Sequence, residues 1–228
     1  KLSILHDSVA LGVSGPVGLA QRICGEVGNL WERKSLSGKK PFEAMTIVRE
    51  ALWKHVEPEL KAAQQAMKVI GPEAAAESAL CATVIALPVS KTPCLFQFNQ
   101  QCSPEEATDD LPFVAIGSGQ KIADPFLAFL RRIFWRSVLP TLGEGTFAVL
   151  WTLKHAIQTT PGGISDPTQV IVLRKTSDKW QARELLELEK QEHEQAITEA
   201  ERSLVQFRDG FRKPDQEDQS SAIPKPTS

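Results

Sequence analysis

The sequence predicts an α+β protein that folds as a four-layer αββα sandwich, and two observations carry this prediction. Predicted strands and helices come in groups, in the order strand-strand-helix-helix-strand-strand-strand-helix-helix-strand, which argues against the alternation of a parallel βαβ fold. Such grouping suits two antiparallel sheets packed against each other, with helix layers outside. The chain has 228 residues, with 42% hydrophobic and 24% charged side chains, and can therefore bury a core of this size.

The opening segment predicts two short strands, a glycine turn and a helix start. Residues 2–5 form an apolar run, and residues 9–13 alternate between apolar and small side chains, as in a half-buried strand. Gly15 breaks the second strand. Pro16 suits the first position of a helix because it has no amide hydrogen to leave unpaired. We expect this first helix to end near Trp31.

A second helical pattern begins near Pro41 and continues to Ile70. Pro58 lies inside it and is expected to kink or divide the helix, because proline lacks the amide hydrogen of the helix ladder. Residues 79–87 and 94–98 are then rich in apolar and β-branched side chains, which predicts a β-hairpin.

The second half of the predicted sandwich repeats this grouping. Residues 112–116 predict a strand that ends at Gly117, and Asp124-Pro125 is expected to open a helix. A further helix covers residues 147–157, and residues 169–173 form the last clear strand.

The chain changes character after residue 175. Residues 178–208 are rich in Glu and contain neither Gly nor Pro, which predicts a long charged helix, although the apolar pattern sustains no heptad. Residues 209–228 are polar, contain three prolines and are predicted to be disordered. We therefore expect a folded domain over 1–175, a charged helix over 176–208 and a disordered tail.

Composition excludes several classes of function. The formal net charge of −2 argues against nucleic acid as a partner, and no apolar run approaches the ~20 residues that span a membrane. No spacing of His or Cys suits a metal, so no metal or other cofactor is expected. The four cysteines show no C-x-x-C spacing and predict free thiols in a reducing, cytoplasmic compartment: Cys24, Cys81, Cys94 and Cys102.

Three short motifs resemble the proteasome subunit family, which includes β-type proteasome subunits and the bacterial HslV-type peptidase. They are KLSIL at residues 1–5, GPVGLA at residues 15–20 and AIGSG at residues 115–119. The resemblance extends over residues 1–175 and suggests a divergent bacterial member. It implies the N-terminal nucleophile hydrolase fold, which is an αββα sandwich.

The resemblance also implies a part that this sequence does not contain. Members of the family carry a nucleophilic Thr at the mature N-terminus, and two strands and an Asp separate that Thr from the lysine matched by Lys1. We therefore expect that the chain lacks the first strands of its fold and the nucleophile. The fragment alone is expected to be inactive.

The resemblance assigns catalytic roles to Lys1, Gly15 and Ser118. Lys1 would favour the deprotonated nucleophile, the Gly15 amide would stabilise the oxyanion, and Ser118 would support proton transfer. Without the resemblance, Lys1 is an ordinary solvated lysine, Gly15 a turn glycine and Ser118 a turn serine.

One loop departs from the family pattern Asp-x-x-Ser-Gly-Gly. Here the corresponding residues are Gln158-Thr159-Thr160-Pro161-Gly162-Gly163. Gln158 cannot act as a carboxylate and Pro161 has no hydroxyl, whereas Thr160 and Ser165 are candidates to compensate. The departure weakens the prediction of catalysis and leaves the prediction of the fold intact.

The leading hypothesis is a threonine-type endopeptidase subunit that hydrolyses unfolded polypeptide inside a ring-shaped particle. The resemblance implies other copies or paralogous subunits as partners and leaves an ATPase regulator open. The alternative is a non-catalytic structural ring subunit of the same fold, which the departures at Gln158 and Pro161 motivate. An unrelated α/β binding module is a third hypothesis.

Overall fold

Five antiparallel strands form the larger of two sheets, with the strand order β1-β2-β3-β4-β5. The structure is a computed structural model that describes residues 1–160 and 164–212. The hairpins β1–β2 and β3–β4 pair across β2 and β3, where Leu11 lies opposite Ile85. The strands are β1 (Leu2–Leu5), β2 (Val9–Ser14), β3 (Ala82–Val89), β4 (Thr92–Phe98) and β5 (Pro104–Glu106).

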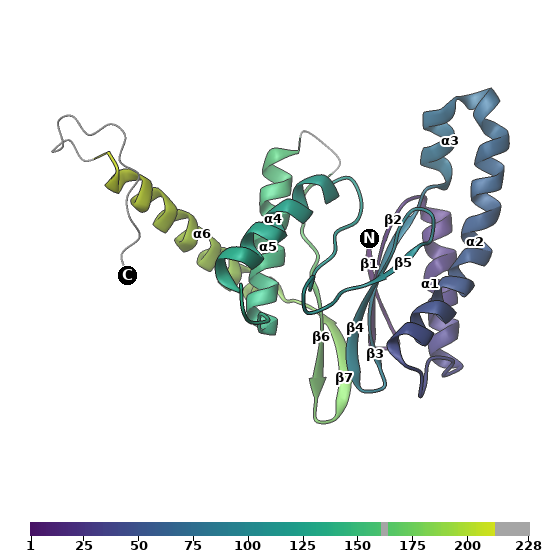
Figure 1. Ribbon diagram of the computed structural model, residues 1–228, viewed down its shortest axis with the longest axis horizontal. Helices are drawn as coiled ribbons and strands as arrows, with labels where there is room; N and C mark the ends of the chain where they lie inside the picture. Colours follow the sequence, from purple (N-terminus) through teal and green to yellow (C-terminus); the bar gives the residue numbers. More distant parts are fainter. Residues whose placement is uncertain (161–163, 213–228) are drawn as a thin grey trace.

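One face of this sheet packs against two long helices (Figure 1). These are α1 (Val17–Glu32) and α2 (Pro41–Ile70), and the short helix α3 (Pro72–Ala79) follows α2. Alternate strand residues face these helices, as the two-residue period of a strand requires. The resulting first core contains, among others, Val9, Leu11, Ile85, Leu87, Phe96 and Phe98 from the strands and Ile23, Val48 and Leu52 from the helices.

The second sheet is an antiparallel pair, β6 (Ile171–Thr176) and β7 (Lys179–Glu184). Its helices are α4 (Gln120–Phe134), α5 (Leu142–Thr159) and α6 (Glu187–Gly210). Figure 1 shows α4 and α5 on the side of the strands opposite α1 and α2, with α6 extending away from the body. The second core includes Leu130, Trp151, Val172, Leu185 and Ile197. The predicted four-layer αββα sandwich is therefore confirmed.

One predicted strand is absent among the described residues, and one predicted division of a helix does not occur. Residues 112–116 form no strand among the described residues, and the short β5 follows β4 instead. Pro112 contributes no amide hydrogen to a ladder, which disfavours pairing there. Helix α2 is continuous through Pro58, so the proline does not divide it, because the helix on both sides is held by packing: Val56 is buried, and Leu60 packs against the first core.

The predicted charged helix over 178–208 begins instead with strand β7. A turn at Ser177 and Asp178, both with positive φ, reverses the chain, and β7 then pairs with β6. The Ala182 amide also donates to the Asp7 carbonyl at 2.7 Å, which ties β7 to the β1–β2 turn. The domain boundary predicted at residue 175 thus falls within β6, and the charged helix is limited to α6 (Glu187–Gly210).

The remainder of the predicted tail, residues 213–228, lies outside the described residues. Within residues 1–160 and 164–212, no helix combines the length and the apolar character that crossing a membrane requires.

Candidate active site

The three predicted catalytic residues, Lys1, Gly15 and Ser118, line one cavity of about 620 Å³. The cavity collects residues from the ends of β1 and β2, from the loop before α4, from α4 and α5, and from the segment that leads into β6. Its volume lies in the range of roughly 300–1,000 Å³ that is usual for ligand sites. Residues far apart in the sequence therefore meet where a substrate could bind.

Lys1 is held at the end of β1 by a reciprocal pair of backbone hydrogen bonds. Its nitrogen donates to the Val13 carbonyl at 2.9 Å, and the Val13 amide donates to the Lys1 carbonyl at 3.1 Å. This is the hydrogen-bonded pair of an antiparallel ladder, so the position of Lys1 is fixed relative to the end of β2. In the part of the chain that the structure describes, no carboxylate forms an ion pair with the Lys1 ammonium.

Gly15 is required by the geometry of the backbone. Its φ of +145° is rare for residues with side chains, and a Cβ there would lie 2.7 Å from the Leu80 carbonyl oxygen and 2.9 Å from Cys81 Cα. Helix α1 begins at Val17, with Pro16 as the residue before it. The amino end of α1, which carries a partial positive charge, therefore lies next to the cavity.

Ser118 is held between two glycines that approach other parts of the chain closely. A Cβ on Gly117, whose φ is +90°, would lie 3.0 Å from the Ser14 Oγ. A Cβ on Gly119 would lie 2.3 Å from Ile164 Cδ1. The glycines thus allow the loop to press against β2 and residue 164, with Ser118 at the cavity wall.

The sequence prediction missed Ser14, which also lines the cavity and lies beside Gly117. The signal was present in the alternation of β2, because Ser14 shares a face of the strand with Gly12, another cavity residue. Thr152 also lines the cavity, but its hydroxyl donates to the Ala148 carbonyl at 2.7 Å within α5.

The loop that departs from the family pattern places no carboxylate in the cavity. Gln158 and Ser165 are exposed and do not line it, and Ile164 is an apolar wall residue. The Thr160 hydroxyl is buried without a hydrogen-bond partner among the described residues and does not line the cavity either. Pro161, Gly162 and Gly163 lie outside the described residues.

The described cavity wall contains no Asp, Glu or His, so Lys1 is the ionisable side chain that the described part contributes. Cys81, whose Cβ approaches Gly15, is no alternative nucleophile, because burial raises the pKa of its thiol. Burial also raises the pKa values of Cys94 and Cys102 to about 11. No cluster of three metal-binding side chains occurs in residues 1–160 and 164–212.

The chain is similar in structure to Anbu (ancestral beta-subunit) from Yersinia bercovieri. The identity is 15%, the match covers 96% of this chain and 86% of that chain, and the TM-score is 0.58. At this identity the likeness shows a shared fold. No family model matches the chain, and no curated protein matches it.

These comparisons correct one expectation from the sequence. The motifs at residues 1–5, 15–20 and 115–119 suggest the family of β-type proteasome subunits and the HslV-type peptidase, but no family model or curated sequence supports that assignment. The assignment is therefore wrong, and the shared fold with Anbu takes its place. Short glycine-containing motifs reflect the turns of a fold, which unrelated sequences on that fold also need.

Proposed function

We propose that this chain is a subunit of a ring-shaped particle that hydrolyses peptide bonds, with a nucleophilic threonine that precedes Lys1. The observation that carries the proposal is the meeting of Lys1, Gly15 and Ser118 in one cavity. Lys1 and Gly15 are brought together by the β1–β2 hairpin, and Ser118 joins them from a loop far along the chain, so the meeting of all three is a stronger argument than any motif alone. The likeness to Anbu, which is described as an ancestral beta-subunit, supports a role as a subunit of a larger assembly.

Each residue has a role in the proposed reaction that its chemistry allows. The threonine hydroxyl would attack the scissile carbonyl carbon while its own α-amine accepts the proton. The Lys1 ammonium would favour the deprotonated nucleophile, and it has no described carboxylate partner that would neutralise it. The Gly15 amide and the amino end of α1 would stabilise the oxyanion, and Ser118 would support transfer of the proton from the α-amine to the leaving amine. Water would then hydrolyse the acyl ester, which releases the carboxylic acid product and restores the threonine hydroxyl.

The proposed partners follow from this activity. They are other copies or paralogous subunits in the ring and an unfolded polypeptide as substrate, and the activity leaves an ATPase regulator open. The proposed compartment is the cytoplasm, and the four cysteines, all of which are free thiols in the structure, support a reducing environment.

A second candidate function is a non-catalytic ring subunit. The observation that favours it is the composition of the cavity wall, which holds no carboxylate among the described residues. A carboxylate that supports a nucleophile would have to come from outside the described residues. The two candidates differ in one property that can be measured, namely the chemistry of the mature N-terminus.

The test is N-terminal sequencing and intact-mass analysis of the native protein, purified from its source. The proposal expects a mature first residue that is a threonine, upstream of Lys1. A blocked terminus, or a first residue without a hydroxyl or thiol, would contradict the peptidase and leave the non-catalytic subunit. A chain that begins at Lys1 is a matched negative control and should not cleave peptides.

A further inference from the structure

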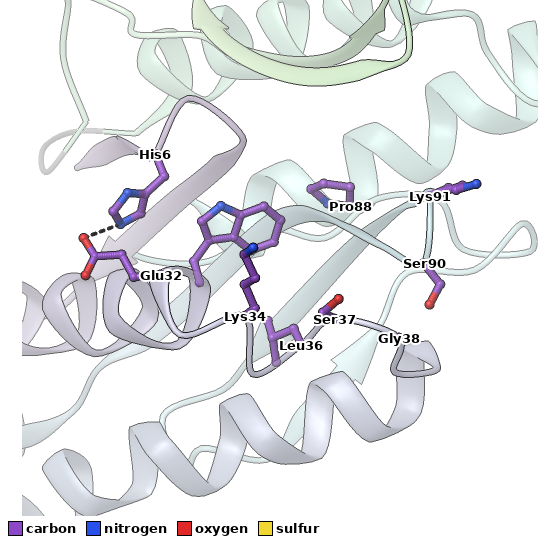
Figure 2. A pocket seen from close by; sticks show the side chains of 10 residues that line it. His6, Glu32, Lys34, Leu36, Ser37, Gly38, Pro88, Ser90 and Lys91 are labelled. Carbon is purple, nitrogen blue, oxygen red and sulfur yellow. Dashed lines mark ion pairs between the residues drawn. The ribbon is translucent and has the colours of Figure 1, made fainter.

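A second cavity, of about 770 Å³, lies apart from the candidate active site and shares no lining residue with it. Three connections build its wall: the β1–β2 turn with His6, the segment between α1 and α2, and the β3–β4 turn with Ser90 and Lys91 (Figure 2). These turns lie at the opposite end of β2 from Gly15. The volume is again that of an ordinary small-molecule site.

The wall combines an apolar surface with two positive charges. Trp31, Leu36 and Pro88 provide the apolar part, and Lys34 and Lys91 provide the cations. Neither lysine forms an ion pair with any carboxylate among the described residues. Two uncompensated ammonium groups beside an apolar surface attract a ligand that is both apolar and negatively charged.

The one acidic wall residue has a partner of its own. The Glu32 carboxylate lies 3.5 Å from His6 Nε2, and a protonated His6 would form an ion pair with it. Figure 2 shows this pair at one end of the cavity and Ser90 with Lys91 at the other. A bound anion would therefore place its charge toward the lysines, away from Glu32.

The turns that carry the wall are held in defined conformations. His6, Lys34, Ser90 and Lys91 all have positive φ values, between +47° and +75°, which cost energy for residues with side chains. The Ser90 hydroxyl also donates to the Lys39 carbonyl at 2.6 Å, which ties the β3–β4 turn to the segment between α1 and α2. A cavity whose walls are fixed before binding loses less entropy when a ligand enters.

We propose that this second cavity binds a small organic anion with an aromatic or branched apolar body. The apolar body would lie against Trp31, Leu36 and Pro88, and the carboxylate would lie between Lys34 and Lys91. Ser37 lines the same wall and offers a hydroxyl donor to the ligand, whereas the Ser90 hydroxyl already donates to the Lys39 carbonyl. The proposal does not depend on the peptidase activity, because the two cavities have no residue in common.

The test uses 1-naphthoate as the probe and its neutral analogue 1-naphthamide as the matched ligand. Isothermal titration of the full chain should show that naphthoate binds roughly tenfold or more tightly than naphthamide, because hydrogen bonds between an ammonium group and a carboxylate are stronger than those to a neutral amide. Lys34→Gln and Lys91→Gln should each weaken naphthoate binding by several-fold and leave naphthamide binding unchanged. Lys54→Gln, on the exposed surface of α2, is the control variant and should change neither.

Three outcomes would overturn the proposal. The first is no binding of naphthoate at millimolar concentration, and the second is equal affinity for naphthoate and naphthamide. The third is a Lys34→Gln or Lys91→Gln protein that binds naphthoate as tightly as the Lys54→Gln control. Circular dichroism of each variant checks that a loss of affinity does not come from unfolding.

Discussion

The two hydrophobic cores of this molecule differ in their side chains and in the size of the sheet that each contains. The first core packs the five-stranded sheet against α1 and α2 with mainly aliphatic side chains, and its strand residues Ile85 and Phe96 are fully buried. The second core has only a two-stranded sheet and relies on aromatic side chains of α4 and α5, several of which are partly exposed. The first core thus rests mainly on buried apolar packing, with an ion pair between Arg22 of α1 and Glu59 of α2 outside it, whereas the second core buries less apolar surface and is joined to α6 by polar contacts.

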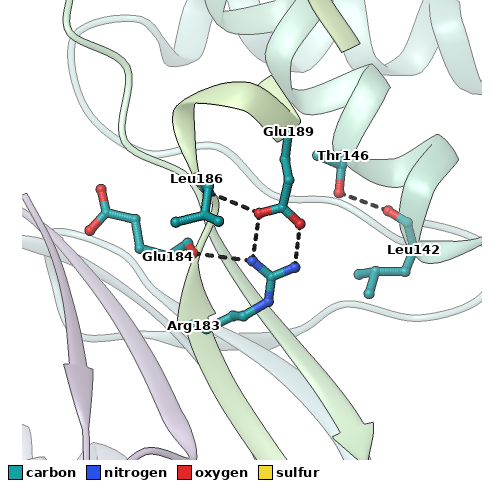
Figure 3. Close-up of polar contacts among 6 residues, drawn as sticks. All are labelled: Leu142, Thr146, Arg183, Glu184, Leu186 and Glu189. Atoms are coloured by element: carbon teal, nitrogen blue, oxygen red, sulfur yellow. Dashed lines mark hydrogen bonds and ion pairs between the residues drawn. The ribbon is translucent and has the colours of Figure 1, made fainter. Parts of the chain in front are cut away.

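Those polar contacts join α6 to the second core. The Trp151 indole donates to Glu201 at 3.2 Å, and the Lys154 ammonium donates to the other oxygen of Glu201 at 2.9 Å. Arg183 at the end of β7 binds Glu189 in α6 through two hydrogen bonds of 2.7 and 2.5 Å (Figure 3). Regions with less buried apolar surface open at lower free energy, so we expect the second core to open before the first.

The largest effect is expected from Phe96→Ala in the first core. Phe96 is 0% exposed, and its truncation should reduce the free energy of unfolding by about 3–5 kcal/mol, because it removes buried apolar surface and leaves a cavity. Urea denaturation followed by circular dichroism measures the loss. The control is Phe42→Ala, a 71% exposed residue of α2, which should change stability by less than about 0.5 kcal/mol.

Ile197→Ala should reduce the free energy of unfolding by less, and the loss of stability should be confined to the second core. Ile197 is the buried residue of α6, and its truncation should cost about 2–4 kcal/mol. Amide hydrogen exchange should increase in α6 and leave β2 and β3 protected. Equal loss of protection in β2 and β3 would contradict the separation of the two cores. Val205→Ala, at an exposed position of the same helix, is the control.

The smallest effect concerns the ion pair between Arg183 and Glu189 and depends on pH. Hydrogen bonds from Arg183 and from the Leu186 amide lower the pKa of Glu189 from 4.5 to about 2. Its contribution to stability is therefore complete above pH 4.5 and is lost as the pH falls toward 2. In the Glu189→Gln protein, the free energy of unfolding should therefore decrease less between pH 4.5 and pH 2 than in the unmodified protein. The exposed residue Glu192 gives the control Glu192→Gln, and identical acid profiles for both variants would contradict the account.

The sequence predicted the elements whose apolar pattern is strong. The alternation before Gly15, the break at Gly15 and the helix after Pro16 all appear in the structure, because one residue face must be buried in each. The sequence-based prediction missed β7. This strand has the sequence KWQARE and buries only Ala182, so it is defined by backbone pairing and by the hydrogen bond to Asp7. The hydrophobic pattern of a single segment cannot predict backbone pairing with residues far away in the sequence.

The same contrast applies to the two cavities. Lys1, Gly15 and Ser118 were predicted from motifs and line one cavity, and the structure adds Ser14 to its wall, whose closeness to Gly117 depends on tertiary structure. The second cavity gave no sequence signal, because its wall comes from three turns that only the fold brings together. In the sequence alone, nothing distinguishes Lys34 and Lys91 from other surface lysines.

The measurement that tests the proposed peptidase most directly is the rate of peptide hydrolysis by the native, processed protein with Lys1→Met. The account predicts that kcat falls by at least roughly 100-fold while KM stays nearly the same, as expected when a positive charge that favours the deprotonated nucleophile is removed. Lys54→Met, on the exposed surface of α2, should retain the rate of the unmodified protein. Equal rates for the Lys1→Met and Lys54→Met proteins would contradict the role of Lys1 and with it the proposed active site.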